Sequence, residues 1–280
     1  MNGNSSWRSS APEVDLFLLA YLGLGLVTGF VAGLLGVGGG LVMVPALVWA
    51  YAAQGFSPEY NIHLALGTSL AVIVPTSISS LRAHHAHGAV DWTTVRRIVP
   101  GILAGTLLGS LAAAWLPDTG LKAFFTLFLF YAATQMLLGF KPKPSREMPG
   151  WSGMTLAGGV IGLVSSWVGI GGGTLSVPFL TWRNAGLRRA IGTSSAIGFP
   201  IAVAGTIGYI ISGQTVGGLP TASLGFVYLP ALAAIATGSW LTAPYGARAT
   251  HRWPVAMIKK IFAGLLYLIG VRMAYGLLAG

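Results

Sequence analysis

Ten stretches of apolar residues, separated by short polar or glycine-rich segments, follow one another along the 280-residue chain. In the first half they lie near 16–35, 41–53, 63–82, 94–116 and 119–140, and in the second half near 153–168, 174–182, 190–211, 222–246 and 255–278. Most have the length of about 20 residues that an apolar α-helix needs to cross a bilayer. The second segment of each half is too short for this, and each follows three consecutive glycines.

Charged residues are scarce within these stretches. No Asp, Glu, Lys or Arg occurs between Glu147 and Arg183, or between Arg189 and Arg248. Only 8% of the residues are charged and 54% are hydrophobic, with a mean hydropathy of +0.74, whereas a soluble domain has about 25% charged residues. The sequence therefore predicts an all-α polytopic membrane protein with the lipid bilayer as its surroundings.

The net charge of +10 comes from short basic clusters between the apolar segments. Such clusters are typical of cytoplasmic loops, so we expect no nucleic-acid partner. The chain has no cysteine, which excludes disulfides, a thiol nucleophile and thiolate metal ligands.

A glycine motif occurs twice. "GLLGVGGGLVMVPAL" begins at Gly33 and "VGIGGGTLSVPFL" at Val168, and alignment of their triple glycines also aligns their Val-Pro pairs. Downstream, the Gly-Thr-Ser at 67–69 matches the Gly-Thr-Ser at 192–194. Shared order and spacing indicate a duplicated unit. We expect a first repeat over 1–140, a cytoplasmic linker over 141–150 and a second repeat over 151–280.

The basic clusters also predict an orientation. If all are cytoplasmic, both termini lie outside, and because each repeat has five segments the second repeat is inverted. The clusters are Arg82, Arg96 and Arg97; Lys141, Lys143 and Arg146; Arg183, Arg188 and Arg189; and Arg248, Arg252, Lys259 and Lys260. Inverted repeats are the architecture of many secondary transporters, with the substrate bound near the bilayer midplane. A multi-pass protein of the inner membrane is expected.

Each glycine motif, with its short following segment, predicts a hairpin whose tip lies near the midplane. Free N–H groups at the start of a helix, at the positive end of its dipole, form a site for an anion. The candidate substrate-binding residues are Gly38, Gly39, Gly40, Thr68, Ser69, Gly171, Gly172, Gly173, Thr193, Ser194 and Ser195. Two structural alternatives stay open: the glycines let helices pack closely, and the hydroxyls cap helix starts.

Buried carboxylates, which proton-driven carriers commonly use, are absent from all predicted spans. A membrane potential of about 100 mV, negative inside, favours outward movement of each negative charge by about 2.3 kcal/mol, so export of an anion needs no coupling ion. A passive anion channel is the nearest alternative. A membrane-embedded metal enzyme would use His84, His85 and His87, but no further carboxylate or cysteine completes that site, so we expect no enzyme, metal or cofactor. Arg272, inside the last segment, is expected to extend toward the membrane surface.

At these motifs the chain resembles the TauE/SafE family of membrane permeases, often described as sulfite exporters. The resemblance rests on "GLLGVGGGLVMVPAL", "ALGTSLAVIVPTSISS", "HHAHGAVDW", "VGIGGGTLSVPFL", "AIGTSSAIGFP" and "GYIISG". It implies an inner-membrane permease for small sulfur-containing or organic anions, with about eight spans. The combined expectation is a permease that exports sulfite, a sulfonate or a related small anion by alternating access.

Overall fold

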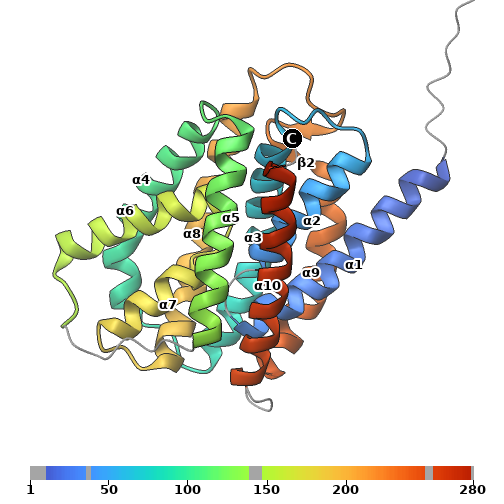
Figure 1. The fold of residues 1–280 in the computed structure, drawn as a ribbon. Coiled ribbons are helices and arrows are strands. Elements are labelled where there is room, and N and C mark those ends of the chain that lie inside the picture. Colours follow the sequence, from blue (N-terminus) through green and yellow to red (C-terminus); the bar gives the residue numbers. More distant parts are fainter. Residues whose placement is uncertain (1–10, 36–38, 139–146, 250–254, 279–280) are drawn as a thin grey trace, which may run out of the picture.

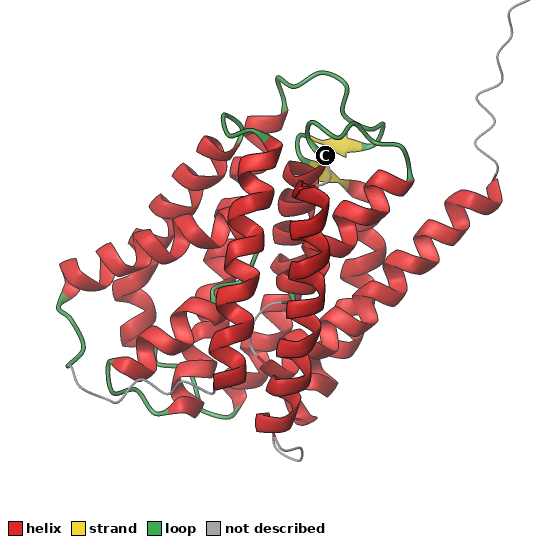
Figure 2. Ribbon diagram, in the orientation of Figure 1, coloured by secondary structure: helices red, strands yellow, loops and turns green. Residues whose placement is uncertain are grey.

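A computed structural model describes residues 11–35, 39–138, 147–249 and 255–278 of the chain. In this part the chain forms ten α-helices and one two-stranded sheet (Figures 1 and 2). The elements are α1 (Ala11–Leu35), α2 (Gly40–Ala53), α3 (Asn61–Ala86), α4 (Trp92–Ala113), α5 (Asp118–Leu138), α6 (Trp151–Val168), α7 (Gly173–Trp182), α8 (Leu187–Gly213), β1 (Ser223–Leu224), β2 (Val227–Tyr228), α9 (Leu229–Ala249) and α10 (Val255–Leu278).

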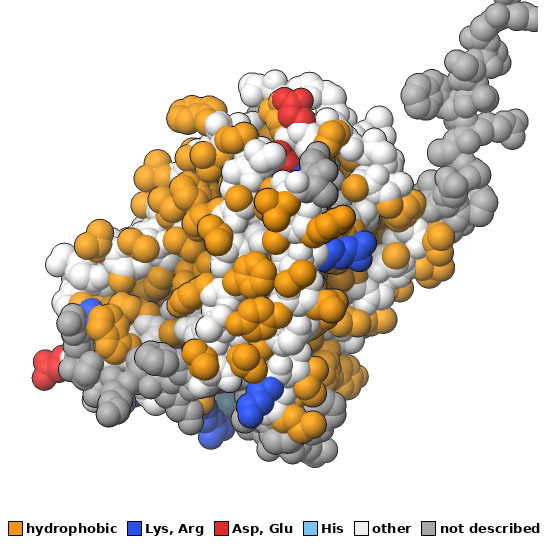
Figure 3. All heavy atoms as spheres, viewed as in Figure 1, with side chains coloured by type: hydrophobic (Ala, Val, Ile, Leu, Met, Phe, Trp, Pro, Cys, Tyr) orange, Lys and Arg blue, Asp and Glu red, His pale blue; other side chains and the backbone are white. Residues whose placement is uncertain are grey.

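Seven of these helices are long and apolar enough to cross a membrane, namely α1, α3, α4, α5, α6, α8 and α10. The helix α2, with 14 residues, and α7, with 10 residues, are shorter. The expected all-α polytopic membrane fold is confirmed. In the space-filling view, hydrophobic side chains cover much of the visible side (Figure 3), as a surface in contact with lipid requires.

The start of one helix was predicted too early in the sequence. A helix over 222–246 was expected, but β1 and β2 form an antiparallel hairpin before α9 begins at Leu229. Ala222 and Gly225 both have positive φ, 66° and 55°, a conformation that a right-handed helix cannot contain. The apolar composition of 222–228 concealed this turn.

The ten described helices form two sets of five, α1–α5 and α6–α10, in which α1 corresponds to α6, α2 to α7 and so on. When both helices of one of the most extensively packed pairs are replaced by their counterparts, the result is again a packed pair. The pair α1 and α9 matches α6 and α4, the pair α3 and α9 matches α8 and α4, and the pair α2 and α3 matches α7 and α8. The helices α3 and α8 also contact each other and are the most buried of the seven candidate spans. This pattern is what a duplicated unit would give; the opposite orientation of the two repeats stays a prediction.

Glycines let the helices of two of these pairs approach closely. A β-carbon added at Gly101 or Gly105 of α4 would collide with the backbone of α6 at Thr155 or Gly159. One at Gly25 of α1 would likewise collide with Ile235 of α9. Small residues at such contacts are typical of helix pairs in membranes. Close backbone contact makes α4 with α6, and α1 with α9, tightly joined pairs.

Charged side chains differ between the two ends of the molecule. The lower end in Figure 1 contains the α3–α4 and α7–α8 connections and the start of α10. Among the described residues, the basic side chains at this end are Arg82, Arg96, Arg97, Arg183, Arg188, Arg189, Arg248 and Lys260, and Asp91 and Glu147 accompany them. The predicted cytoplasmic residues Lys141, Lys143, Arg146 and Arg252 lie outside the described residues. We call it the basic end. Glu59 and Asp118 lie at the opposite end.

Candidate functional site

Both glycine motifs end in a buried turn that starts a short helix. Gly39 and Gly172 are the N-cap residues of α2 and α7, with left-handed φ values of 72° and 54°, which residues with a β-carbon rarely adopt. Neither N-cap has a side-chain hydrogen bond to the helix start. Among the described residues, therefore, the first turns of α2 and α7 begin without a side-chain cap.

The two motifs meet in the interior of the protein. A β-carbon added at Gly40 would collide with the carbonyl oxygen of Gly169 and would lie 3.1 Å from Cα of Ile170. The Ser69 hydroxyl donates a hydrogen bond of 2.8 Å to the same Gly169 oxygen. Gly40, Ser69 and residues of the second motif are thus brought together, although they are far apart in the sequence. Gly38 lies outside the described residues.

The two candidate threonines each hold the chain just before a helix. The Thr68 hydroxyl oxygen accepts the backbone N–H of Tyr228 at 3.0 Å, and that of Thr193 accepts the N–H of Asp91 at 3.0 Å. Tyr228 directly precedes α9 and Asp91 directly precedes α4. In both cases, the threonine fixes the chain as it enters the next helix. Their hydroxyl oxygens are therefore used structurally in this conformation.

The glycine that precedes each threonine packs against the same segment of chain that the threonine holds. A β-carbon at Gly67 would collide with the carbonyl oxygen of Phe226, and one at Gly192 with that of Ala89. Each of these carbonyls lies two residues before the N–H that the neighbouring threonine accepts. The Gly-Thr pairs are equivalent clamps on two loops, a role that local sequence gave no sign of.

A small cavity, lined in part by hydroxyl groups, lies between α3 and α8 beside the second glycine motif. Its volume is about 20 Å³, enough for one water molecule. It is lined by Ala32, Ile73, Thr76, Ser77, Ser80, Gly171, Ser195 and Gly198. The hydroxyls of Ser80 and Ser195 are 3.3 Å apart across it. We call this cavity the hydroxyl chamber; its lining residues carry no charge.

Several buried hydroxyls around the second motif have no hydrogen-bond partner in the described structure. They belong to Ser165 of α6, Thr174 and Ser176 of α7, and Ser194 of α8, all at most 3% exposed. The Ser176 oxygen lies 3.4 Å from the position of a β-carbon at Gly172. An unsatisfied buried polar group costs about 1–3 kcal/mol, so these groups indicate a place for water or a polar solute.

Three of these hydroxyls, on Ser165, Thr174 and Ser176, were missed by the sequence interpretation. Serine and threonine are ordinary residues of membrane helices, where they bond to backbone carbonyls. Alignment of the two motifs could have drawn attention to these hydroxyls, because the apolar residues Ala32, Leu41 and Met43 occupy the matching positions of the first half. The candidate site is therefore polar mainly on the side of the second motif.

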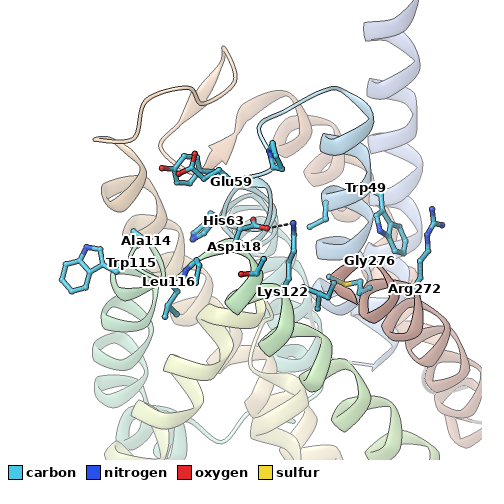
Figure 4. A pocket seen from close by; sticks show the side chains of 17 residues that line it. Trp49, Glu59, His63, Ala114, Trp115, Leu116, Asp118, Lys122, Arg272 and Gly276 are labelled. Carbon is cyan, nitrogen blue, oxygen red and sulfur yellow. Dashed lines mark ion pairs between the residues drawn. The ribbon is translucent and has the colours of Figure 1, made fainter. Parts of the chain in front are cut away.

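A separate pocket of about 810 Å³ opens at the opposite end of the molecule, where α2 ends and α3 and α5 begin (Figure 4). The Lys and Arg side chains that line this pocket both interact with other residues. Lys122 forms an ion pair with Asp118, and the Arg272 guanidinium lies 4.4 Å from the centre of the Trp49 ring, a favourable cation–π contact. The exposed Arg272 lines this pocket, away from the glycine motifs.

The histidines near the end of α3 give no support to a metal enzyme. Nδ1 of His85 accepts a hydrogen bond from the Trp92 indole at 3.3 Å, and a ring nitrogen of His87 lies 2.7 Å from the Ala83 carbonyl oxygen. Among the described residues there is no group of three or more His, Cys, Asp or Glu that could hold a metal ion.

Comparison with known proteins identifies the family. The model of the sulfite exporter TauE/SafE family matches residues 21–273. A protein of Haemophilus influenzae named "Probable membrane transporter protein" is 37% identical, over 92% of this chain and 98% of its own length. YunE of Bacillus subtilis, with the same description, is 27% identical over 90% of this chain and 95% of its own.

A more distant relative, MJ0441 of Methanocaldococcus jannaschii, is also named a probable membrane transporter protein. It is 24% identical over 93% of this chain and 98% of its own length. No solved structure matches the chain significantly. The match of the family model over most of the chain, together with seven helices able to span a membrane, shows that this protein is a multi-pass membrane transporter of the TauE/SafE family.

Proposed function

We propose that this transporter is a permease for small anions that exports sulfite, a sulfonate or a related organic anion. The observation that carries the proposal is the meeting of the two glycine motifs in the interior, beside buried hydroxyls without partners. The sulfur-containing substrate class follows from the family description. Export rather than uptake rests on the membrane potential, which drives anions outward.

The polarity of the short helices favours an anion over a cation. The N-termini of α2 and α7 are buried, and neither has an acidic residue in its first turn. The positive end of a helix dipole attracts negative charge, and the Thr174 and Ser176 hydroxyls on α7 add donors. A bound cation would face these same positive ends without a carboxylate from either first turn.

Movement of the α1–α9 pair against the α4–α6 pair, each of which has one helix from each repeat, would supply alternating access. The pair α1 and α9 contacts α3, and the pair α4 and α6 contacts α8. Because α3 and α8 also contact each other, these two helices lie between the tightly joined pairs. Such pairs are suited to move as rigid units about a central site. Inverted repeats would make the two directions of this movement structurally equivalent.

A flux panel in reconstituted vesicles tests the function. Purified protein in liposomes would be offered sulfite, sulfate, sulfoacetate and small carboxylates at a controlled voltage. We expect saturable flux of at least one sulfur-containing anion that increases as the anion-loaded interior becomes negative. The absence of flux for every member of the panel would refute the permease.

The same vesicles separate the permease from its two alternatives. A permease shows counterflow, in which unlabelled anion on one side accelerates entry of labelled anion from the other, whereas a passive channel does not. A metal enzyme predicts loss of function in His85→Ala and little effect of Gly172→Ala. The permease predicts the reverse.

A further inference from the structure

Near the crossing of α3 and α8, some positions match between the two repeats and others differ. The clamps are equivalent, since Thr68 and Thr193 each accept an N–H that precedes a helix. When the two Gly-Thr-Ser motifs are aligned, Ser195 corresponds to Leu70 and Ser80 corresponds to Gly205. The polar pair Ser80 and Ser195 thus corresponds to the apolar pair Leu70 and Gly205, and each pair has one residue on α3 and one on α8.

The two pairs create different surroundings. Toward the basic end, the Ser80 and Ser195 hydroxyls line the hydroxyl chamber and are 3.3 Å apart. At the matching place toward the other end, a β-carbon at Gly205 would lie only 2.7 Å from Cδ1 of Leu70, so the leucine fills the space. Leu70 is fully buried. The chamber therefore has no polar counterpart at the Leu70–Gly205 contact.

We propose that the hydroxyl chamber is the part of the anion-binding site that opens toward the basic end, and that Leu70 is the gate that closes this site from the other end. This inference rests on the proposed anion permease. It adds Thr76, Ser77 and Ser80 to the site, and it assigns Leu70 a role in the transport cycle.

Charge and hydrogen bonding fit an anion that arrives from the basic end. Arg82 lies two residues beyond Ser80 on α3, and Arg188 and Arg189 lie in the first turn of α8, so their field raises the local concentration of anions. The chamber hydroxyls of Thr76, Ser77 and Ser195 now donate to carbonyls of their own helices. A hydroxyl can rotate, so each is able to donate to an anion instead.

The small volume of the chamber has a mechanistic consequence. About 20 Å³ holds one water molecule and is too small for an oxyanion with four or more heavy atoms. Binding therefore requires α8 to move relative to α3, which would enlarge the chamber while Leu70 stays against Gly205. In the conformation described here, the chamber has room for one water molecule and Leu70 packs against Gly205.

The absence of cysteine from the chain allows a direct test by single-cysteine labelling. Ser80→Cys, Ser195→Cys and Leu70→Cys variants in sealed vesicles would be treated from either side with a membrane-impermeant maleimide. Two exposed glycines with open surroundings, replaced in Gly186→Cys at the basic end and Gly217→Cys at the opposite end, report which face is reached.

We expect Ser80→Cys and Ser195→Cys to react from the face that labels Gly186→Cys, about tenfold faster than Leu70→Cys, because thiol modification requires access. Sulfoacetate should slow the labelling of Ser195→Cys and leave that of Gly186→Cys unchanged. Labelling of the two chamber positions from the Gly217→Cys face, or equal labelling of Leu70→Cys, would overturn the inference.

A gate variant gives an independent measurement. Leu70→Ala should increase passive sulfoacetate leak several-fold and reduce counterflow, because the opposite end is no longer sealed. Leu64→Ala, another fully buried leucine of α3, controls for the cavity and should not leak. Unchanged leak in Leu70→Ala, with the variant folded, contradicts the gate. Failure of the anion permease itself would show instead as no flux in the unmodified protein, whatever the labelling pattern.

Discussion

Gly172 combines two requirements that only glycine meets. Its φ of 54° lies in the left-handed region, and a β-carbon there would lie 2.7 Å from Cδ1 of Ile201. Gly39, at the equivalent turn, has a φ of 72°, and its β-carbon would lie 2.9 Å from the carbonyl oxygen of Thr28. The glycine motifs are therefore structural turns in the first place, and their place beside unpartnered hydroxyls is the basis of the binding role proposed above.

Replacement of Gly172 separates strain from crowding. Gly172→Ala should lower both the transport rate and the thermal stability, since the left-handed conformation costs an alanine about 1–2 kcal/mol and the methyl group displaces Ile201. Gly55→Ala is the matched control, with a φ of 74° and nothing within 4 Å. It should lose only the part of the stability that the strained conformation costs, and it should keep full transport per folded molecule. Equal transport by both variants would remove Gly172 from the site.

Thr68 provides a second test at this scale. Thr68→Val removes the acceptor for the Tyr228 N–H and should lower the free energy of unfolding by about 1–3 kcal/mol. Thr68→Ser keeps the hydroxyl and should restore most of this loss. Because the hydroxyl oxygen holds a loop, the KM for the anion should stay unchanged in both. A KM raised in Thr68→Val and normal in Thr68→Ser would instead place Thr68 in contact with the substrate.

Residue types and spacing picked out some of the buried glycines and hydroxyls, but not Ser165, Thr174 and Ser176, and not the separate roles of the residues. Ser69 and Ser195 do lie beside the second motif or the chamber, whereas the threonines next to them hold loops. A hydroxyl in an apolar helix is used by whichever backbone group lies closest, and that depends on tertiary packing. The loops before α4 and α9 could not be placed from local sequence.

At the scale of elements, the short helices were predictable and their partners were not. Counting apolar residues after each glycine motif was enough to show that α2 and α7 are short. The contact of α4 with α6 could not be found this way, because lipid and protein neighbours of a membrane helix are similarly apolar. The hairpin before α9 was missed for a related reason, since hydropathy does not distinguish an apolar turn from a helix.

The glycine contact between α4 and α6 can be tested directly. Gly101→Leu should prevent α4 from packing on α6, because its β-carbon alone already collides with the Thr155 carbonyl, and overpacking typically costs about 1–3 kcal/mol or more. We expect loss of folded protein in gel filtration after detergent extraction. Gly264→Leu on α10, where a β-carbon meets nothing within 4 Å, should behave as the unmodified protein. Normal folding of Gly101→Leu would mean that this pair is not tightly joined.

The described part of the molecule has one basic end, the hydroxyl chamber near it and an apolar contact between Leu70 and Gly205 beyond. The basic loops that the structure describes lie at one end, as expected from the rule that basic loops are cytoplasmic, whereas the cluster of Lys141, Lys143 and Arg146 lies outside the described residues and the orientation in the membrane stays a prediction. The chamber could not be predicted, because it depends on which faces of α3 and α8 meet. The packed helix pairs of the two halves correspond to each other, which agrees with the duplication inferred from the glycine motifs.

Labelled sulfite efflux from vesicles at a fixed inside-negative potential tests the central claim most directly, when the unmodified protein is compared with a variant carrying Gly39→Leu and Gly172→Leu. The account predicts saturable, voltage-driven efflux from the unmodified protein, loss of that efflux in the double variant, and normal efflux from Gly264→Leu, all measured per folded molecule. Undiminished efflux from a folded double variant would contradict a binding site at the glycine motifs.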